Sequence, residues 1–190
     1  MTTVYFVRHA KPDFSIHDDL TRPLTKEGLQ DSKRVTDFLI DKQIDHVYSS
    51  PYLRAIDTIK DFAKRAQLHI KLVEDFRERK VSDEWIEDFD GFAKRQWQDW
   101  DYRLPDGESL NQVQRRNVAA LRELINQHPN QNIVIGTHGT SMSTMLNYFD
   151  HHFDYQFFNR IKHEMPLIIC AKFNGENLVD VEEFTINELN

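Results

Sequence analysis

Four side chains whose chemistry suits phosphate groups stand where the chain leaves short apolar runs of the sequence. These side chains are Arg8, His9, Arg54 and His138. Guanidinium groups bind phosphate oxygens through paired hydrogen bonds, and a neutral imidazole is a nucleophile. Taken singly, each is most simply a surface arginine or a hydrogen-bonded histidine. Brought together, they would form a phosphate pocket that contains a histidine nucleophile.

The apolar runs before these residues are typical of buried strands, because they are short and rich in Val, Ile, Tyr and Phe. They cover residues 3–7, 46–48, 69–73 and 132–136. Helical patterns follow Thr25, Ser50-Pro51, Gly107 and His138. Residues 167–173 and 178–184 flank Asn174-Gly175, and this arrangement predicts a β-hairpin.

This alternation of strands and helices predicts an α/β fold, a three-layer sandwich with a mostly parallel central sheet. We expect a single domain that spans residues 1–190. In open sheets of this kind, ligands bind outside the carboxyl ends of the strands. The four phosphate-binding candidates should therefore meet at one sheet edge, near helix N-termini that favour an anion.

Residues 74–106 interrupt the pattern. They are rich in charge and contain Trp85, Trp97 and Trp100. We expect a helical insertion that lies over the C-terminal ends of the strands. Packing is the main role that we predict for the three indole rings, and a substrate lid is the secondary interpretation.

The composition excludes several classes of protein. The 190 residues are 39% hydrophobic and include 13 Phe, which is enough for a folded core. The net charge of −7 and the absence of a basic run disfavour nucleic-acid binding. The single cysteine, Cys170, excludes a disulfide framework. Without an apolar run of membrane-spanning length or a signal-peptide pattern, we expect a cytoplasmic protein with no membrane partner. These features leave the oligomeric state open.

Two further constellations are weaker. Thr140-Ser141 lacks the Gly-x-Ser-x-Gly pattern of serine hydrolases. His151-His152 with His163 suggests a metal site, but adjacent histidines do not share one helix face as residues four apart do. We therefore predict neither a metal nor a cofactor.

Five segments resemble, in order, the motifs of the histidine phosphatase superfamily, also called the phosphoglycerate mutase-like family. They are Val7-Arg8-His9-Ala10, Leu24-Thr25-Lys26-Glu27-Gly28, Ser49-Ser50-Pro51 through Arg54-Ala55 with Thr58, Pro105-Asp106-Gly107-Glu108-Ser109, and Gly136-Thr137-His138-Gly139. A match to Arg-His alone is unspecific, whereas five ordered matches over residues 4–139 are specific.

The resemblance implies a role for each of the four side chains. His9 would be the nucleophile that accepts the phosphoryl group, and Arg8, Arg54 and His138 would hold the phosphate. An imidazole is nucleophilic only when neutral, so its other nitrogen should be fixed by a hydrogen-bond acceptor. The cationic partners would stabilise the charge on the transferring group, so no metal is needed.

The resemblance also implies a carboxylic acid that protonates the leaving oxygen. In the family it is a Glu shortly after the third strand, and Glu78 is our candidate. The alternatives are Glu74, Glu84 and Glu87, each of which is more simply a solvated surface charge.

The sequence departs from the family pattern around the nucleophile. Ala10 replaces the usual Gly, and Lys11-Pro12 replaces the frequent Glu-Thr. Ser15 stands where many members have a phosphate-binding Asn, and we predict a phosphate contact from its hydroxyl, with an ordinary loop serine as the alternative. Trp85-Ile86-Glu87 is a shifted remnant of the common Trp-Glu-Gly. These changes concern substrate contacts and leave the reaction intact.

We expect a phosphatase that hydrolyses small phosphorylated metabolites through a phosphohistidine. A phosphoglycerate mutase must keep its phosphohistidine dry, and the insertion at 74–106 is short for that purpose. Phosphoglycerate mutase-type transfer is the alternative among enzymes. A non-catalytic module that binds phosphorylated ligands is the alternative from another class.

Overall fold

The computed structural model describes residues 1–189 and contains one six-stranded sheet with the order β3-β2-β4-β1-β5-β6. The strands are β1 (Thr2–Arg8), β2 (His46–Ser49), β3 (Ile70–Leu72), β4 (Asn132–Thr137), β5 (Leu167–Asn174) and β6 (Asn177–Thr185). β3, β2, β4 and β1 are mutually parallel, while β5 pairs antiparallel with β1 and β6 pairs antiparallel with β5 at the sheet edge. The predicted mostly parallel sheet and C-terminal hairpin are confirmed.

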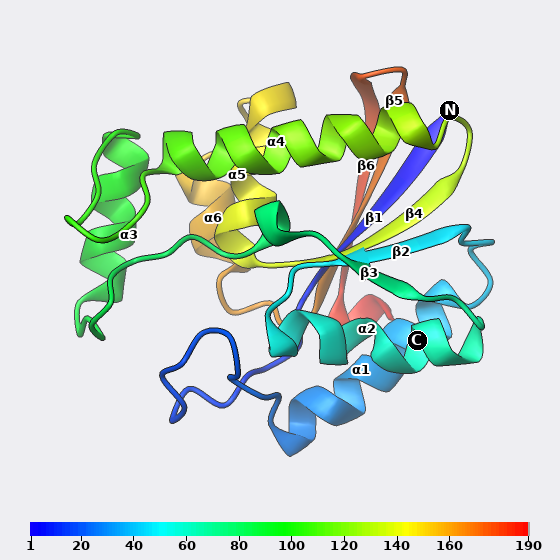
Figure 1. The fold of residues 1–190 in the computed structure, drawn as a ribbon, viewed down its shortest axis with the longest axis horizontal. Coiled ribbons are helices and arrows are strands. Elements are labelled where there is room, and N and C mark those ends of the chain that lie inside the picture. The colour runs from blue at the N-terminus through cyan, green and yellow to red at the C-terminus, as the bar shows by residue number, and fades with distance from the viewer. Residues whose placement is uncertain (190) are drawn as a thin grey trace.

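Helices cover both faces of the sheet and make it the middle of three layers (Figure 1). One face carries α1 (Lys26–Leu39) and α2 (Leu53–Arg65). The other carries α4 (Leu110–Gln127), α5 (Gly139–Phe149) and α6 (Tyr155–Ile161). The remaining helical elements are α3 (Phe89–Gln98) and the short 3-10 helices η1 (Glu74–Phe76) and η2 (Ile186–Glu188). The predicted three-layer α/β sandwich is confirmed.

The continuous apolar character of the strands follows from burial on both faces. Phe6 and Ile135 point into a core shared with α4, α5 and α6. Val7 and Val134, their neighbours along the strands, point into a second core shared with α1 and α2. Successive side chains of a strand alternate between faces, so each strand needs apolar residues at consecutive positions.

Two helix starts follow from local sequence chemistry. The Thr25 hydroxyl accepts a hydrogen bond from Gly28 N at 3.0 Å, as its predicted N-cap role requires. Ser109 and Gln112 form a reciprocal capping box at the start of α4. These caps fix where the loop 10–25 and the insertion rejoin the sandwich.

The insertion at 74–106 is less helical than predicted. Only α3 and the single turn η1 are helical, and the stretch 77–88 between them is extended loop. α3 packs through Trp97 against Phe158 of α6 and Leu110 of α4. The short helix α6 has no counterpart among the predicted elements.

None of the helices in residues 1–189 is long and apolar enough to cross a membrane.

Candidate active site

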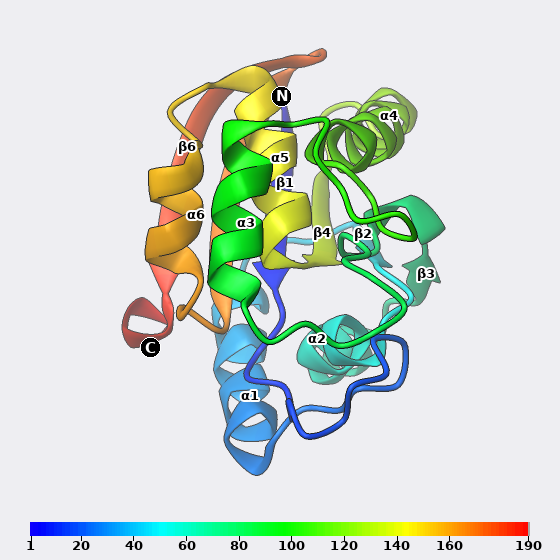
Figure 2. The same ribbon diagram turned by 90° about the vertical axis from the view of Figure 1, so that its left-hand side faces the viewer.

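The carboxyl ends of three neighbouring parallel strands bring the predicted phosphate-binding residues together. Arg8 and His9 end and follow β1, His138 follows β4, and Arg54 lies in the first turn of α2 after β2. All four side chains are buried, with Arg8 the most accessible at 7% exposure. Figure 2 looks onto this end of the molecule, where α3, the loop 10–25 and the start of α5 surround the strand ends.

His9 is held as a neutral imidazole with one nitrogen free. Its Nδ1 lies 2.8 Å from the carbonyl oxygen of Ala10, which can only accept a hydrogen bond. Nδ1 therefore carries the proton, and Nε2 carries a lone pair. Burial lowers the pKa of His9 well below its ordinary value, and the charges of Arg54 and Arg8 lower it further. The ring thus has the protonation state of a nucleophile at neutral pH.

His138 faces His9 with an unpartnered nitrogen. The ring centroids lie 5.3 Å apart, and His138 Nε2 lies 2.8 Å from the Ser50 hydroxyl. Its Nδ1 is buried and has no hydrogen-bond partner. Burial, followed by the charge of Arg54, lowers the pKa of His138 well below its ordinary value. Assigning the Ser50 hydroxyl as donor to Nε2 leaves an Nδ1–H group that can donate to a ligand.

Arg8 connects the site to the end of α6. Its Nη atoms donate to the carbonyl oxygens of Ile161, Lys162 and Glu164, while its Nε is buried without a partner. Burial lowers the pKa of Arg8 to about 10, and the charge of Glu78 opposes that shift. A Cβ at position 139 would lie 3.1 Å from the guanidinium, so Gly139 permits this close approach.

Arg54 is held by the loop 10–25. It donates to the carbonyl oxygen of Asp19 at 2.7 Å and to Asp19 Oδ1 at 3.3 Å. The same Oδ1 accepts from the buried Arg22, which also donates to the carbonyl oxygens of Ile16 and His17. The pairing of Asp19 with two buried arginines closes this loop beside the site.

The Glu78 carboxylate lies at the N-terminus of α5, where it contacts the two residues that follow His138-Gly139 in the sequence. Its Oε1 accepts from Arg79 N at 2.8 Å, Ser141 N at 3.0 Å and Ser141 Oγ at 3.1 Å. Its Oε2 accepts only from Thr140 N, at 3.0 Å. Oε1 is fully occupied, whereas Oε2 has room to carry a proton.

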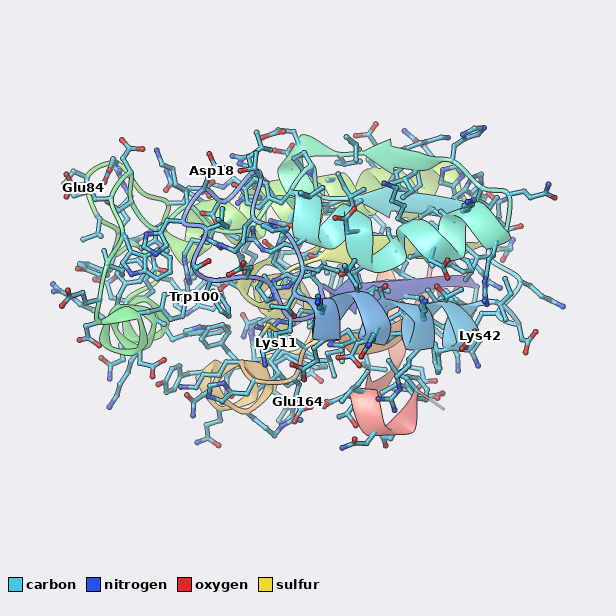
Figure 3. The ribbon with its side chains drawn as sticks, turned by 90° about the horizontal axis from the view of Figure 1, so that it is seen from below. Lys11, Asp18, Lys42, Glu84, Trp100 and Glu164 are labelled. Carbon is cyan, nitrogen blue, oxygen red and sulfur yellow. The ribbon has the colours of Figure 1, made fainter. Side chains whose placement is uncertain are left out.

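Of the four carboxylates that we considered as the acid, Glu78 has the closest connection to the site. Glu74 is exposed in η1, and Glu84 and Glu87 are exposed in the extended part of the insertion. Seen from below, Glu84 lies at the outer end of the molecule, away from the sheet (Figure 3).

Ser15 is exposed and belongs to a tight turn. Its backbone N–H and its hydroxyl both donate to Asp13 Oδ1, at 3.0 Å and 2.7 Å. The structure shows no hydrogen bond between Ser15 and the four phosphate-binding candidates, and its phosphate contact stays a prediction.

Several residues around the site were absent from the sequence-based candidates. The Tyr52 ring lies 5.3 Å from that of His138 and 5.0 Å from Arg54 Cζ. Arg116 donates to the Glu108 carboxylate and to the carbonyl oxygens of Asp75, Arg77 and Glu78, so it fixes the backbone that carries the candidate acid. The only sequence signal for Arg116 is its position two helical turns after Glu108.

The three tryptophans divide between packing and the site rim. Trp97 is buried and meets Trp100 edge-on, with their ring centroids 5.3 Å apart. Trp85 is 53% exposed and stacks on His17 of the loop 10–25, with ring centroids 4.0 Å apart and planes 9° from parallel. Packing accounts for Trp97 and Trp100, whereas Trp85 connects the insertion to the loop.

The histidines considered for a metal site, His151, His152 and His163, belong to no group of three possible ligands among the described residues. His152 Nδ1 lies 2.8 Å from Asp150 Oδ1. Within residues 1–189, no group of three His, Cys, Asp or Glu side chains is placed to hold a metal ion.

Comparison with known proteins identifies the family. Residues 4–182 match the histidine phosphatase superfamily (branch 1). Over 150 residues the chain is 26% identical to the uncharacterized phosphatase PhoE of Bacillus subtilis (strain 168), covering 77% of this chain and 76% of that protein. Over 154 residues it is 30% identical to phosphoglycerate mutase-like protein 4 of Arabidopsis thaliana, covering 72% and 66%.

The fold is similar to that of a solved phosphatase. A phosphoserine phosphatase mutant from Entamoeba histolytica, in complex with phosphoserine, superposes with a TM-score of 0.83 over 100% of both chains at 19% identity. The match over residues 4–182 shows that the protein belongs to the histidine phosphatase superfamily, as its motifs indicate. It is a phosphatase of the histidine phosphatase type.

Proposed function

We propose that this phosphatase hydrolyses small-molecule phosphomonoesters through a phosphohistidine formed on His9. The observation that carries the proposal is a convergence of unpartnered polar atoms. His9 Nε2 has no hydrogen-bond partner, and His138 Nδ1 and Arg8 Nε are buried without one. Buried polar atoms are normally satisfied, so two buried donors beside the lone pair of His9 at one sheet edge are explained by a ligand that carries several acceptor oxygens.

In the first step, His9 Nε2 attacks phosphorus and the bond between phosphorus and the ester oxygen breaks. Arg8 Nε, Arg54 and His138 Nδ1–H donate to the phosphoryl oxygens as charge builds on them. Glu78 gives its proton, carried on Oε2, to the departing alkoxide. The products are an alcohol and a phosphohistidine.

In the second step, water attacks phosphorus and the bond to His9 Nε2 breaks. Glu78, now a carboxylate, takes a proton from that water, which restores the starting state and releases inorganic phosphate. The electrostatic work falls to arginine and histidine, so no metal takes part in either step. We propose that the enzyme acts in the cytoplasm, where small phosphorylated metabolites are found.

Water is the proposed acceptor because the insertion is small. A mutase must enclose its phosphohistidine while the bisphosphate intermediate reorients. Here residues 74–106 supply one regular helix, and its buried side chains Trp97 and Phe92 pack within the protein. One relative of this chain is named a phosphoglycerate mutase-like protein. Mutase-type phosphoryl transfer is therefore the alternative reaction that the experiments must distinguish from hydrolysis.

The direct test is to trap the intermediate. Acid-labile, base-stable phosphate should appear on the native protein quenched during turnover of 4-nitrophenyl phosphate, and His9→Ala should lack both this phosphate and the activity. His46→Ala is the matched control, because His46 lies at the opposite end of the sheet, and it should retain both. Full activity in His9→Ala would contradict the assignment.

The same preparation distinguishes the alternatives. Phosphate release from 3-phosphoglycerate is compared with its conversion to 2-phosphoglycerate, with and without added bisphosphoglycerate. Interconversion faster than release would identify a mutase. Tight binding of phosphate without turnover or phosphohistidine would identify a binding module.

A further inference from the structure

Arg79 is a buried cation without a counter-ion. Its side chain is 3% exposed, and its Nε and Nη1 have no hydrogen-bond partner. The other buried arginines near the site, Arg8, Arg22 and Arg54, all donate to carbonyl or carboxylate oxygens. Within residues 1–189, no carboxylate lies at ion-pair distance from the Arg79 guanidinium. A buried, unpaired guanidinium is costly, so its N–H groups need an acceptor that the chain itself does not supply.

Aromatic rings are the neighbours of the Arg79 guanidinium. Its Cζ lies 5.3 Å from the ring centroid of Phe89 and 5.4 Å from that of Phe92, both on α3. A phenyl ring attracts a guanidinium but has no oxygen to accept its N–H groups, so these groups remain available for a ligand. The two rings also keep water away from one side, which strengthens any hydrogen bond that the guanidinium makes.

Arg79 belongs to the same wall of the site as the candidate acid. It directly follows Glu78, and its backbone N–H donates to Glu78 Oε1. Burial lowers the pKa of Arg79, and the charges of Glu78 and Asp19 oppose this shift. Asp19 is the residue that holds Arg54 from the opposite loop. The guanidinium therefore lies within electrostatic range of both sides of the site.

We propose that Arg79 forms a second anion subsite, which binds a carboxylate or phosphate group on the leaving-group portion of the substrate. This inference rests on the proposed function, because Glu78 marks the leaving-group side only if it protonates the leaving oxygen. The phosphoryl group itself is bound by the side chains at the strand ends. The preferred substrates are therefore phosphomonoesters whose alcohol portion carries a second negative charge.

Three substrates with one carbon skeleton test this subsite. Propyl phosphate has no second charge, 3-phosphonooxypropanoate has a terminal carboxylate, and 1,3-propanediol bisphosphate has a terminal phosphate. The native enzyme should show a higher kcat/KM for one or both charged substrates than for propyl phosphate. The better of the two identifies the anion that the subsite takes.

Variants then assign the preference to Arg79. Arg79→Met should reduce the ratio of kcat/KM between the preferred charged substrate and propyl phosphate by about 10- to 100-fold, the range for a lost hydrogen bond to a charged group. Arg79→Lys keeps the charge but loses the planar pair of donors, so it should reduce the ratio less.

The matched control is Arg95→Met. Arg95 is an exposed arginine of the same insertion, and its Cζ lies 3.9 Å from the ring centroid of Tyr102. Its loss removes one charge and one contact with an aromatic ring, and the ratio should not change. An equal change of the ratio in both variants would show a general electrostatic effect and overturn the subsite.

Binding measurements separate the subsite from the reaction. Calorimetry with His9→Ala should show tighter binding of the preferred charged compound than of propyl phosphate, and the added substitution Arg79→Lys should weaken that difference. Such binding without any hydrolysis by the native protein would refute the proposed reaction and keep the subsite. Hydrolysis through a phosphohistidine with no preference among the three compounds would refute the subsite and keep the reaction. If Arg79→Met does not fold, the subsite is tested by the substrate preference of the native enzyme and by the change of the kcat/KM ratio in Arg79→Lys.

Discussion

The protein has a pair of neighbouring histidine rings at each end of its parallel strands, and the two pairs differ in how their nitrogens are used. At the amino end, the rings of His46 and His128 lie 3.8 Å apart. His128 contacts Tyr48 Oη and Gln131 Oε1, and His46 contacts the same Gln131 oxygen. At the carboxyl end, the rings of His9 and His138 lie 5.3 Å apart and are buried among arginines.

This difference supports our proposal that the first pair is structural and the second functional. His46 and His128 have protein partners and are only partly buried. His9 and His138 are more deeply buried, yet Nδ1 of His138 has no partner at all. Deep burial combined with an unpartnered polar atom is costly for folding, so it is informative about a ligand.

The largest expected effect tests this contrast directly. His138→Ala should lower kcat/KM for a phosphomonoester on the order of 10²–10³-fold, because it removes one hydrogen-bond donor to the phosphoryl group. His128→Ala should leave kcat/KM unchanged but lower the free energy of unfolding by about 1–2 kcal/mol, because Tyr48 and Gln131 lose a partner. Steady-state kinetics and urea unfolding of both variants check this, and an equal loss of activity would remove the distinction.

A smaller effect extends the comparison to carboxylates. Glu78→Gln should slow hydrolysis of an alkyl phosphate by about 10²-fold, because a poor leaving group needs the proton that the amide cannot give. An activated aryl phosphate should be slowed much less. The exposed Glu84→Gln should leave both rates unchanged. If Glu78→Gln slows both substrates equally, Glu78 has a structural role and does not donate the proton.

The smallest effect concerns pH and stability. Burial lowers the pKa of both His9 and His138, so between those lowered values and about 6.5 the unfolded chain binds protons that the folded protein does not. The contribution of these two histidines to the free energy of unfolding is therefore at its maximum above about pH 7.5. It decreases as the pH falls below about 6.5. The expected loss is up to about 2 kcal/mol per buried histidine between pH 6.5 and 5.

The matching measurement is urea unfolding at pH 7.5 and 5.0. His138→Asn should lose less stability between these values than the native protein, since one buried titrating group is gone. His128→Asn should change the pH dependence less, because His128 is only partly buried. Its pKa is lowered by partial burial, His46 and Lys71, but the hydrogen bond with Gln131 and the charge of Asp45 oppose this shift. A larger effect from His128 would reverse the comparison.

The parts of the fold that sequence reasoning predicted depend on local patterns. Val4 to Val7 are apolar at successive positions because both sheet faces are covered, and the strand ends then place His9 and His138 together. Asn174-Gly175 predicted the hairpin through turn chemistry, and Gly175 has the positive φ of 58° that such a turn needs.

The parts that were missed depend on contacts between distant segments. Nothing local in the sequence indicates that Asp19 would hold Arg54 across 35 positions, or that Arg79 would lack a partner. The insertion was predicted to have helical character. Its extended stretch 77–88 is instead held at its start by long-range hydrogen bonds that Arg116 and Ser141 donate to the carbonyl oxygen of Arg77. The helix α6 has a local signal, Asp154 as its N-cap, but only seven residues.

The contact between Arg8 and the end of α6 has a consequence for how this protein can change in evolution. Arg8 recognises Ile161, Lys162 and Glu164 only through their carbonyl oxygens, and every amino acid provides that oxygen. The side chains of Lys162 and Glu164 are therefore not constrained by this contact, provided that the path of the backbone is kept, whereas Ile161 is fully buried and is constrained by core packing instead. The surface at positions 162 and 164 can therefore change while Arg8 stays in place beside His9.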